Sequence, residues 1–292
     1  MLQNRRTDLA LEAQELWQES AGEQTQLKGV QARDSRREGY AVTTVRILDQ
    51  EGAQALGKPA GTYVTLTVDG LARREEDAFG RAVRAVAAEL TQLLAGLEGP
   101  VLVACLGNRA VTPDAVGPKV HDHLLITRHL VDQAPEHFGA FRPVASVAAG
   151  VLGTTGVESG ELVGALTGRL KPVCIIAVDA LSLDRLCRTI QLADTGIAPG
   201  SGVGNHRHAL DRESLGVPVI AIGVPTVVDG ATLAADLLGT ADLPPLGREG
   251  EMLVTPKDID SQVNDLAKVI GYGITLALQP GLTLEDMELL MS

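Results

Sequence analysis

Three short runs of consecutive apolar residues constrain the fold of this chain more than any other feature. They span residues 101–106 (VLVACL), 173–179 (VCIIAVD, ending in an acid) and 217–222 (VPVIAI). Uniformly apolar runs of this length are typical of strands buried on both faces, as in parallel sheets covered by helices. Apolar residues at helical spacing lie before, between and after these runs, at residues 73–98, 114–131, 158–170, 229–238 and 257–279. The alternation predicts an α/β fold with a mostly parallel sheet and helices on both faces.

The amino-terminal part of the chain differs from this pattern. Residues 40–49 and 62–69 are rich in Thr, Val and Tyr and are joined by a segment with Gly and Pro, which predicts a small antiparallel β element. Before them, residues 1–37 are polar, with a short helix expected near 9–17 and loop elsewhere. We expect one domain over residues 1–292, with a Pro/Gly-containing linker at 239–250 before the carboxyl-terminal helical segment.

Composition excludes several classes of protein. No apolar run approaches the ~20 residues of a membrane span, and the first residues lack the apolar core of a signal peptide. The formal net charge of −12 argues against direct nucleic-acid binding, which needs a basic face. The three cysteines have no paired spacing and favour buried, reduced thiols. These features predict a cytoplasmic protein that uses neither membrane nor nucleic acid as a partner.

Two aspartates follow buried runs and are the first candidates for chemistry. Asp114 comes shortly after the 101–106 run, in a Thr112-Pro113 sequence that predicts a helix start with Thr112 as N-cap, and Asp179 ends the 173–179 run. If the two strands are neighbours, the acids converge at one edge of the sheet, where ligands of open α/β sheets bind. Two close carboxylates share a proton and can activate water. From spacing alone, capping roles for both acids remain the favoured interpretation.

Other motifs are less persuasive. Asp194-Thr195-Gly196 matches the active-site triplet of pepsin-like proteases, but those folds are all-β, so a turn role is favoured. The Gly200–Gly204 loop has neither a dinucleotide-binding nor a P-loop spacing. His121, Asp122 and His123 are expected on a solvated face, and His206 and His208 in a polar loop are weak evidence for a metal. We therefore expect no metal and no cofactor.

Longer motifs resemble the spore germination protease family of endospore-forming bacteria, which are atypical aspartic endopeptidases. The resemblance covers most of the chain. Its motifs are RTDLALEA (6–13), LGN (106–108), VTPDAVGP (111–118), LLITRHL (124–130), FRPVASVAAGVLGTTGVES (141–159), AVDAL (177–181), TIQLADTGIAPGSGVGN (189–205), LGVPVIAIGVPTVVDGAT (215–232) and LVTPKDID (253–260).

The resemblance implies a fold similar to the hydrogenase maturation proteases and a homotetramer in the spore core, which is cytoplasmic. It implies an endopeptidase that hydrolyses small acid-soluble spore proteins during germination. The two functional aspartates of the family fall on Asp114 and Asp179, which reverses the preference for capping roles. In the related maturation proteases, acids at these two places bind nickel together with a histidine.

The resemblance further implies a zymogen that trims its own amino terminus at a substrate-like sequence. That sequence is an acid, a bulky apolar residue, Ala, any residue and Glu, which predicts processing between Asp8 and Leu9 and a propeptide of residues 1–8. We also expect four further residues to line the site: Asn108, Asp194, Asn205 and His206. Two alternatives remain, a metal-assisted peptidase using the same two acids and a non-catalytic relative that binds peptides.

Overall fold

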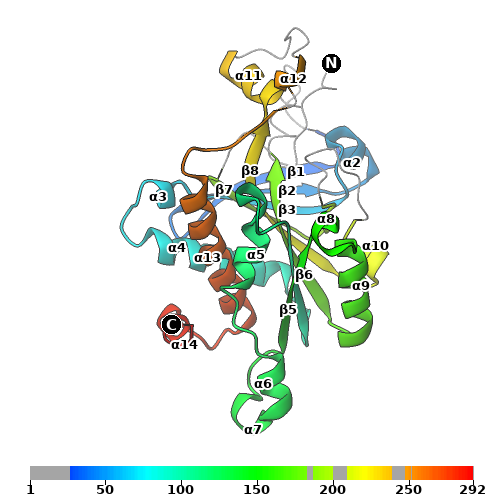
Figure 1. The fold of residues 1–292 in the computed structure, drawn as a ribbon, viewed down its shortest axis with the longest axis vertical. Coiled ribbons are helices and arrows are strands. Elements are labelled where there is room, and N and C mark those ends of the chain that lie inside the picture. The colour runs from blue at the N-terminus through cyan, green and yellow to red at the C-terminus, as the bar shows by residue number, and fades with distance from the viewer. Residues whose placement is uncertain (1–26, 183–186, 200–208, 239–246, 251, 292) are drawn as a thin grey trace.

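The computed structural model describes residues 27–182, 187–199, 209–238, 247–250 and 252–291. Within them lies one nine-stranded mixed sheet (Figure 1). The strands are β1 (Val30–Arg37), β2 (Tyr40–Ile47), β3 (Gly61–Thr67), β4 (Val101–Leu106), β5 (Val144–Gly150), β6 (Cys174–Ser182), β7 (Thr189–Ala193), β8 (Val219–Asp229) and β9 (Leu253–Val254).

Helices connect and follow these strands. They are α2 (Gln50–Leu56), α3 (Asp69–Ala72), α4 (Ala78–Leu93), the 3₁₀ turn η1 (Thr112–Asp114), α5 (Val116–His121), α6 (Arg128–Gln133), α7 (Pro135–Phe138), α8 (Leu152–Thr155), α9 (Ser159–Leu170), α10 (Arg212–Leu215), α11 (Gly230–Leu238), α12 (Gly247–Gly250), α13 (Ile259–Leu278) and α14 (Leu284–Leu290).

The sheet combines a parallel core with an antiparallel part. Its order is β1-β2-β3-β7-β8-β6-β4-β5, with β9 paired antiparallel to β8. Strands β5, β4, β6 and β8 run parallel, whereas β7, β3, β2 and β1 follow in antiparallel pairings. The predicted parallel core and the predicted antiparallel element are both confirmed, and β7 joins them into one sheet.

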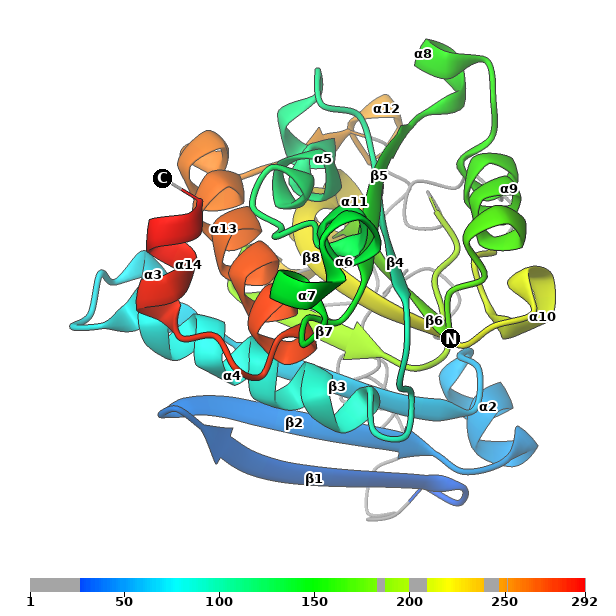
Figure 2. The ribbon, with the colours of Figure 1, turned by 90° about the horizontal axis from the view of Figure 1, so that it is seen from below.

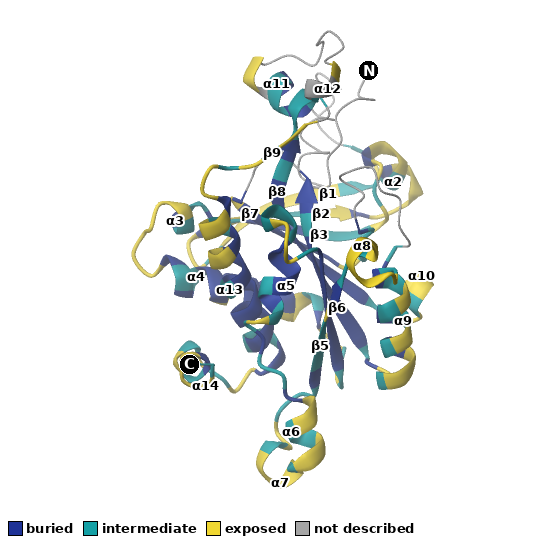
Figure 3. Cartoon of the chain, in the orientation of Figure 1, coloured by how far each residue is buried: buried dark blue, intermediate teal, exposed yellow. Residues whose placement is uncertain are grey.

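Helices cover both faces of the sheet, as predicted. On one face, α4, α5 and α13 pack against side chains such as Val103, Ile176 and Ile222 in the largest apolar cluster. On the other face, α9 and α10 cover a second cluster that includes Leu102 and Ile175. Figure 2 shows the sheet curving beneath α4, with α9 and α10 on the far side. The buried residues concentrate in the strands and in the helices against them (Figure 3).

Strand β1 corrects the expectation that residues 1–37 are loop beyond a short helix. It pairs with β2 over its whole length, from Val30 opposite Ile47 to Arg37 opposite Tyr40. Most of its side chains are exposed, so no alternation of apolar and polar residues marks it as a strand. The short helix expected near residues 9–17 lies outside the described residues.

The single helix predicted over 114–131 is wrong: the chain forms η1, α5 and α6 with an irregular segment at 122–127. Tertiary hydrogen bonds hold that segment. The hydroxyl of Thr127 donates to the carbonyl of Arg142 and accepts from the N–H of Val144, and the hydroxyl of Thr275 on α13 accepts from the N–H of Leu125. These bonds satisfy the backbone without a continuous helix, so the local periodicity is overridden.

Among the described residues, no helix is both long enough and apolar enough to cross a bilayer.

Candidate active site

A tight loop after β4 positions Asp114. Gly107, the first residue after the strand, has a φ of +107°, and a Cβ there would lie 2.1 Å from the carbonyl oxygen of Asp114. Only glycine fits this approach. The N–H of Asn108 then donates to Asp114 Oδ2 at 2.8 Å, and Asn108 Oδ1 accepts from the N–H of Ala110 at 3.0 Å. Asn108 thus lies directly beside Asp114.

The turn that carries Asp114 is anchored to the carboxyl-terminal helix. The hydroxyl of Thr112 donates to Asp260 Oδ1 on α13 at 3.0 Å, so it makes no cap, and the predicted N-cap role of Thr112 is wrong. Pro113 does fall in the first turn, as predicted. The turn η1 contacts β6 and β8 as well as α13. Asp114 is half-buried at the sheet edge, in a turn that contacts strands on one side and α13 on the other.

Asp179 lies on the strand beside β4. Strand β6 pairs in parallel with β4 on one side and with β8 on the other, so the strand before Asp114 and the strand that carries Asp179 are neighbours. Asp179 is buried, with 5% of its surface exposed, and its Oδ1 accepts the N–H of Ala180 at 2.9 Å. It lies within β6, three positions before the strand ends at Ser182, so the strand extends beyond the predicted end at 179 and Asp179 does not cap a helix.

Helix α5 closes the end of both strands. Gly117 lies so near the strand ends that a Cβ there would come 2.1 Å from the carbonyl oxygen of Leu106 and 2.8 Å from that of Val178. This close approach ties the start of α5, and the turn before it, to the residue preceding Asp179. Two carboxyl groups brought to one sheet edge can share a proton, which lets one act as base and the other as acid.

A row of aligned residues extends from Asp179 across the sheet. Asp179 of β6 is in register with Gly223 of β8, which is in register with Gln191 of β7, and Gln191 with Thr65 of β3. Aligned residues of neighbouring strands project to the same face. Gln191 and Thr65 are both buried. Gly223 and Gln191 were not predicted from the sequence. Gln191 could have been singled out, because it is a polar residue inside the apolar run TIQLA.

A cavity of about 340 Å³ opens at this row. The strand residues Leu181, Gln191, Ala193, Ala221 and Gly223 line its floor. The turn after α2, around Lys58, and the segments 195–198 and 209–211 form its sides. Because Gly223 and Leu181 border both the cavity and Asp179, the cavity begins next to that acid.

The Asp194-Thr195-Gly196 triplet serves as a turn at the end of β7. Asp194 is exposed, and its Oδ1 accepts the N–H of Thr62 at 2.7 Å, which ties the start of β3 to this turn. Thr195 and Gly196 line the cavity. Asp194 itself directly precedes these two lining residues. The other predicted residues, Asp8, Leu9, Asn205 and His206, lie outside the described residues.

The histidines near α5 make structural contacts. His121 Nδ1 lies 2.9 Å from Ser146 Oγ on β5, and Asp122 pairs with Arg109 at 2.8 Å. The hydrogen bond from Arg109 lowers the pKa of Asp122, and burial lowers the pKa of His123, whose ring lies against Tyr272. Asp122 is exposed, as the expected solvated face requires, whereas the two histidines are half-buried. Within the described part of the chain, no three His, Cys, Asp or Glu side chains gather as a metal site.

The cysteines are buried and unpaired, as predicted. Burial raises the pKa of Cys105 and of Cys187 to about 12 and that of Cys174 to about 11. A cysteine nucleophile needs a depressed pKa, so none of the three is suited to that role.

Comparison with known proteins decides the family. The family model described as "Germination protease" matches residues 10–242. The chain belongs to the germination protease family. It is 43% identical to the germination protease of Caldanaerobacter subterraneus subsp. tengcongensis, over 98% of each chain. It is 40% identical to that of Clostridium perfringens, over 97% of this chain and 98% of the relative.

The resemblance seen in the sequence motifs is thereby confirmed, and the protein is a peptidase. The germination protease of Bacillus cytotoxicus is 40% identical, over 97% of this chain and 76% of the relative. Among solved structures, the [NiFe] hydrogenase maturation protease HycI from Thermococcus kodakarensis superposes with a TM-score of 0.37 at 18% identity, over 64% of this chain and 98% of its own.

Proposed function

We propose that this germination protease hydrolyses small acid-soluble spore proteins during spore germination, with Asp114 and Asp179 activating the attacking water. The family membership supports the substrate class. The observation that carries the mechanism is that Asp114, in the turn after β4, and Asp179, in the neighbouring parallel strand β6, lie at one sheet edge.

In the proposed mechanism, half-buried Asp114 is the base and buried Asp179 is the acid. Asp114, whose carboxylate accepts the N–H of Asn108, takes a proton from water as the water oxygen attacks the peptide carbonyl carbon. Asp179 holds a proton against the carbonyl oxygen. When the C–N bond breaks, Asp114 passes the proton that it took from water to the departing amine. The products are a carboxylic acid and an amine, and the pair again shares one proton.

The proposal includes autoprocessing between Asp8 and Leu9, so the chain is a zymogen with residues 1–8 as propeptide. The sequence Thr7-Asp8-Leu9-Ala10-Leu11-Glu12 fits the substrate-like pattern, and one active site then reads both the propeptide and the spore proteins. The homotetramer, the location in the spore core, and the absence of nucleic-acid and membrane partners belong to the same proposal.

Mass spectrometry of the amino terminus after a mild acid shift tests this function. We expect a mass loss that matches residues 1–8 in the wild-type protein and no loss in Asp179→Asn. Processing that continues at the wild-type rate in Asp179→Asn would contradict the proposed pair.

Two further measurements distinguish this mechanism from a metal-assisted peptidase and from a non-catalytic relative. Activity that a chelator abolishes and added metal restores would assign the same acids to a metal-assisted peptidase. Stoichiometric binding of a spore protein without cleavage would indicate a non-catalytic relative. The proposed mechanism predicts chelator-resistant cleavage.

A further inference from the structure

The cavity beside Asp179 is hollow because its floor consists of small residues. Ala193, Ala221 and Gly223 occupy strand positions where neighbouring residues such as Ile175 and Val219 are larger. At Gly223, an added Cβ would come 2.4 Å from Leu181 Cδ1, so the Leu181 side chain leans over the glycine. The volume of about 340 Å³ falls within the range of small-molecule and side-chain pockets.

The position of the cavity relates it to the scissile bond. Gly223 is one strand away from Asp179 in the aligned row, and neighbouring strands are about 4.8 Å apart. Leu181 follows Asp179 by two positions and therefore projects to the same face. A peptide whose carbonyl lies at Asp179 thus brings the side chain of an adjacent residue to the cavity.

The polarity of the residues that line the cavity indicates which kind of side chain it can bind. The floor and walls are mainly apolar, from Leu181, Ile197 and the alanines, and Lys58 at one side already has an interaction partner. The carboxylate of Asp211 at one side is already engaged, because its Oδ1 accepts the N–H of Ser214 as the N-cap of α10. A lining of this kind suits an uncharged, apolar side chain rather than an acid.

We infer that this cavity is the specificity pocket for the apolar residue that follows the scissile bond, which is Leu9 at the processing site. The inference rests on the proposed function, since the bond between Asp8 and Leu9 has an acid on one side and an apolar residue on the other. Leu181, Ala193 and Ala221 are the residues that set the size of the accepted side chain.

The experiment compares two synthetic peptides with the full-length protein. One carries residues 6–15 (RTDLALEAQE) and the other has Leu9→Ala. The wild-type protein should prefer the leucine peptide in kcat/KM by about 10–200-fold, the range in which apolar pockets discriminate by size. Ala221→Ile narrows the pocket and should lower kcat/KM for the leucine peptide at least about tenfold, while the alanine peptide changes less than about twofold.

The matched control is Ala41→Ile, the same change at an exposed position of β2, which should alter neither peptide. Leu181→Ala is the second variant and cannot overpack the core. It should raise the preference for a Leu9→Phe peptide over the leucine peptide. If Ala221→Ile fails to fold, the peptide preference of Leu181→Ala tests the pocket on its own.

The outcomes separate this inference from the proposed function. Equal effects of Ala221→Ile on both peptides, or an unchanged side-chain preference in Leu181→Ala, would overturn the pocket while leaving the acid pair intact. Wild-type protein that cleaves neither peptide, or Asp179→Asn that cleaves as well as wild type, would instead overturn the proposed function.

Discussion

The carboxylate of Asp114 accepts the backbone N–H of Asn108 at 2.8 Å, six residues back along the chain. This hydrogen bond closes the loop that leads from β4 into η1, so the side chain proposed as base also shapes its own loop. Structural and chemical roles of Asp114 can be separated because asparagine retains an acceptor oxygen whereas leucine does not.

We therefore predict different stabilities for two variants of Asp114. Asp114→Asn should keep the unfolding free energy within about 0.5 kcal/mol of wild type, because its amide oxygen accepts the same N–H. Asp114→Leu should lower it by about 1 kcal/mol or more, because the N–H of Asn108 loses its acceptor. Urea unfolding at one pH measures both. Equal stability of the two variants would show that the hydrogen bond does not hold the loop.

Gly107→Ala should disrupt the same loop more severely. The positive φ and the 2.1 Å approach to the carbonyl of Asp114 leave no room for a methyl group, so we expect a loss well above about 1 kcal/mol. The matched control is Gly96→Ala, where φ is +79° but no atom lies within 4 Å of the added Cβ. Thermal unfolding of both variants compares them. A Gly96→Ala loss as large as that of Gly107→Ala would refute the steric argument.

Gln279 at the end of α13 joins that helix to the segment before β5. Its amide accepts from the N–H of Arg142 at 2.9 Å and donates to the carbonyl of Arg142 at 2.8 Å, and only 3% of its surface is exposed. Gln279→Leu should cost about 1–3 kcal/mol in unfolding free energy, because the N–H of Arg142 loses its acceptor, whereas the carbonyl of Arg142 keeps the hydroxyl of Thr127 as a donor. Gln262→Leu, which removes an exposed hydrogen bond from Gln262 Nε2 to Asp258 Oδ1 at the start of the same helix, should cost less than about 1 kcal/mol. Similar losses in the two variants would contradict the role of Gln279.

His123 should contribute to loss of stability in weak acid. Burial lowers its pKa below the usual 6.5 in the folded protein, Lys268 adds to this lowering, and Asp122 opposes it. The unfolded chain therefore takes up a proton before the folded protein does. The contribution of His123 is complete above pH 6.5 and is lost as pH falls through the lowered pKa.

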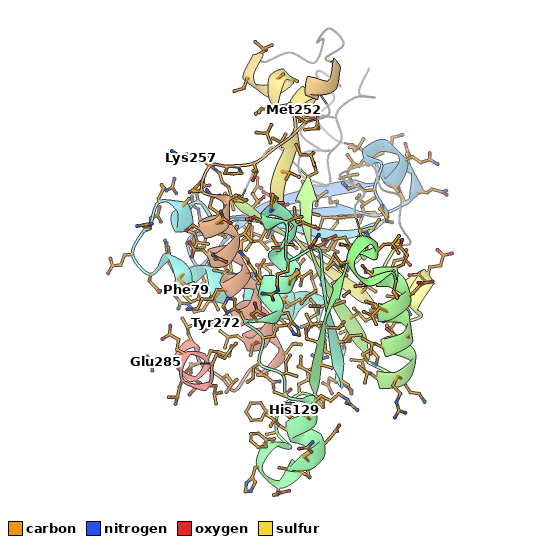
Figure 4. All side chains as sticks on the ribbon, viewed as in Figure 1. Phe79, His129, Met252, Lys257, Tyr272 and Glu285 are labelled. Carbon is orange, nitrogen blue, oxygen red and sulfur yellow. The ribbon has the colours of Figure 1, made fainter. Side chains whose placement is uncertain are left out.

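His123→Gln should accordingly reduce the decline in unfolding free energy between about pH 7.5 and pH 5.5, the window around the ordinary histidine pKa. The control His137→Gln removes a side chain that is 75% exposed and should leave the decline unchanged. Urea unfolding at several pH values gives both curves. A decline in His123→Gln as steep as in wild type would exclude this account. Tyr272 of α13, whose ring packs against His123, and Phe79 of α4, whose ring packs against Tyr272, are labelled in Figure 4.

Burial on both faces explains which strands the sequence predicted well. The run 101–106 became β4 with the predicted bounds, because a strand covered on both faces must be apolar at every position. Strand β1 went unrecognised because most of its side chains meet solvent and hydrogen bonds to β2 hold it. Only tertiary pairing, which local sequence does not encode, identifies such an edge strand.

The candidate site was partly predictable for a related reason. Asp114 and Asp179 could be found from the runs that precede them and from their motifs, and their strands are neighbours as expected. The cavity could not be found, because it depends on the register that aligns Asp179, Gly223 and Gln191. These residues are far apart in the sequence, and a one-residue shift would send each side chain to the opposite face.

The most direct measurement of the central claim is the rate at which pure protein cleaves a small acid-soluble spore protein. Asp114→Asn and Asp179→Asn are compared with wild type and with Asp49→Asn, a control that changes a carboxylate at the N-cap of α2. We predict that each site variant loses at least about 10²-fold in rate, the lower end of general acid–base contributions, while Asp49→Asn retains the wild-type rate. A folded Asp114→Asn or Asp179→Asn protein that cleaves at the wild-type rate would contradict the account.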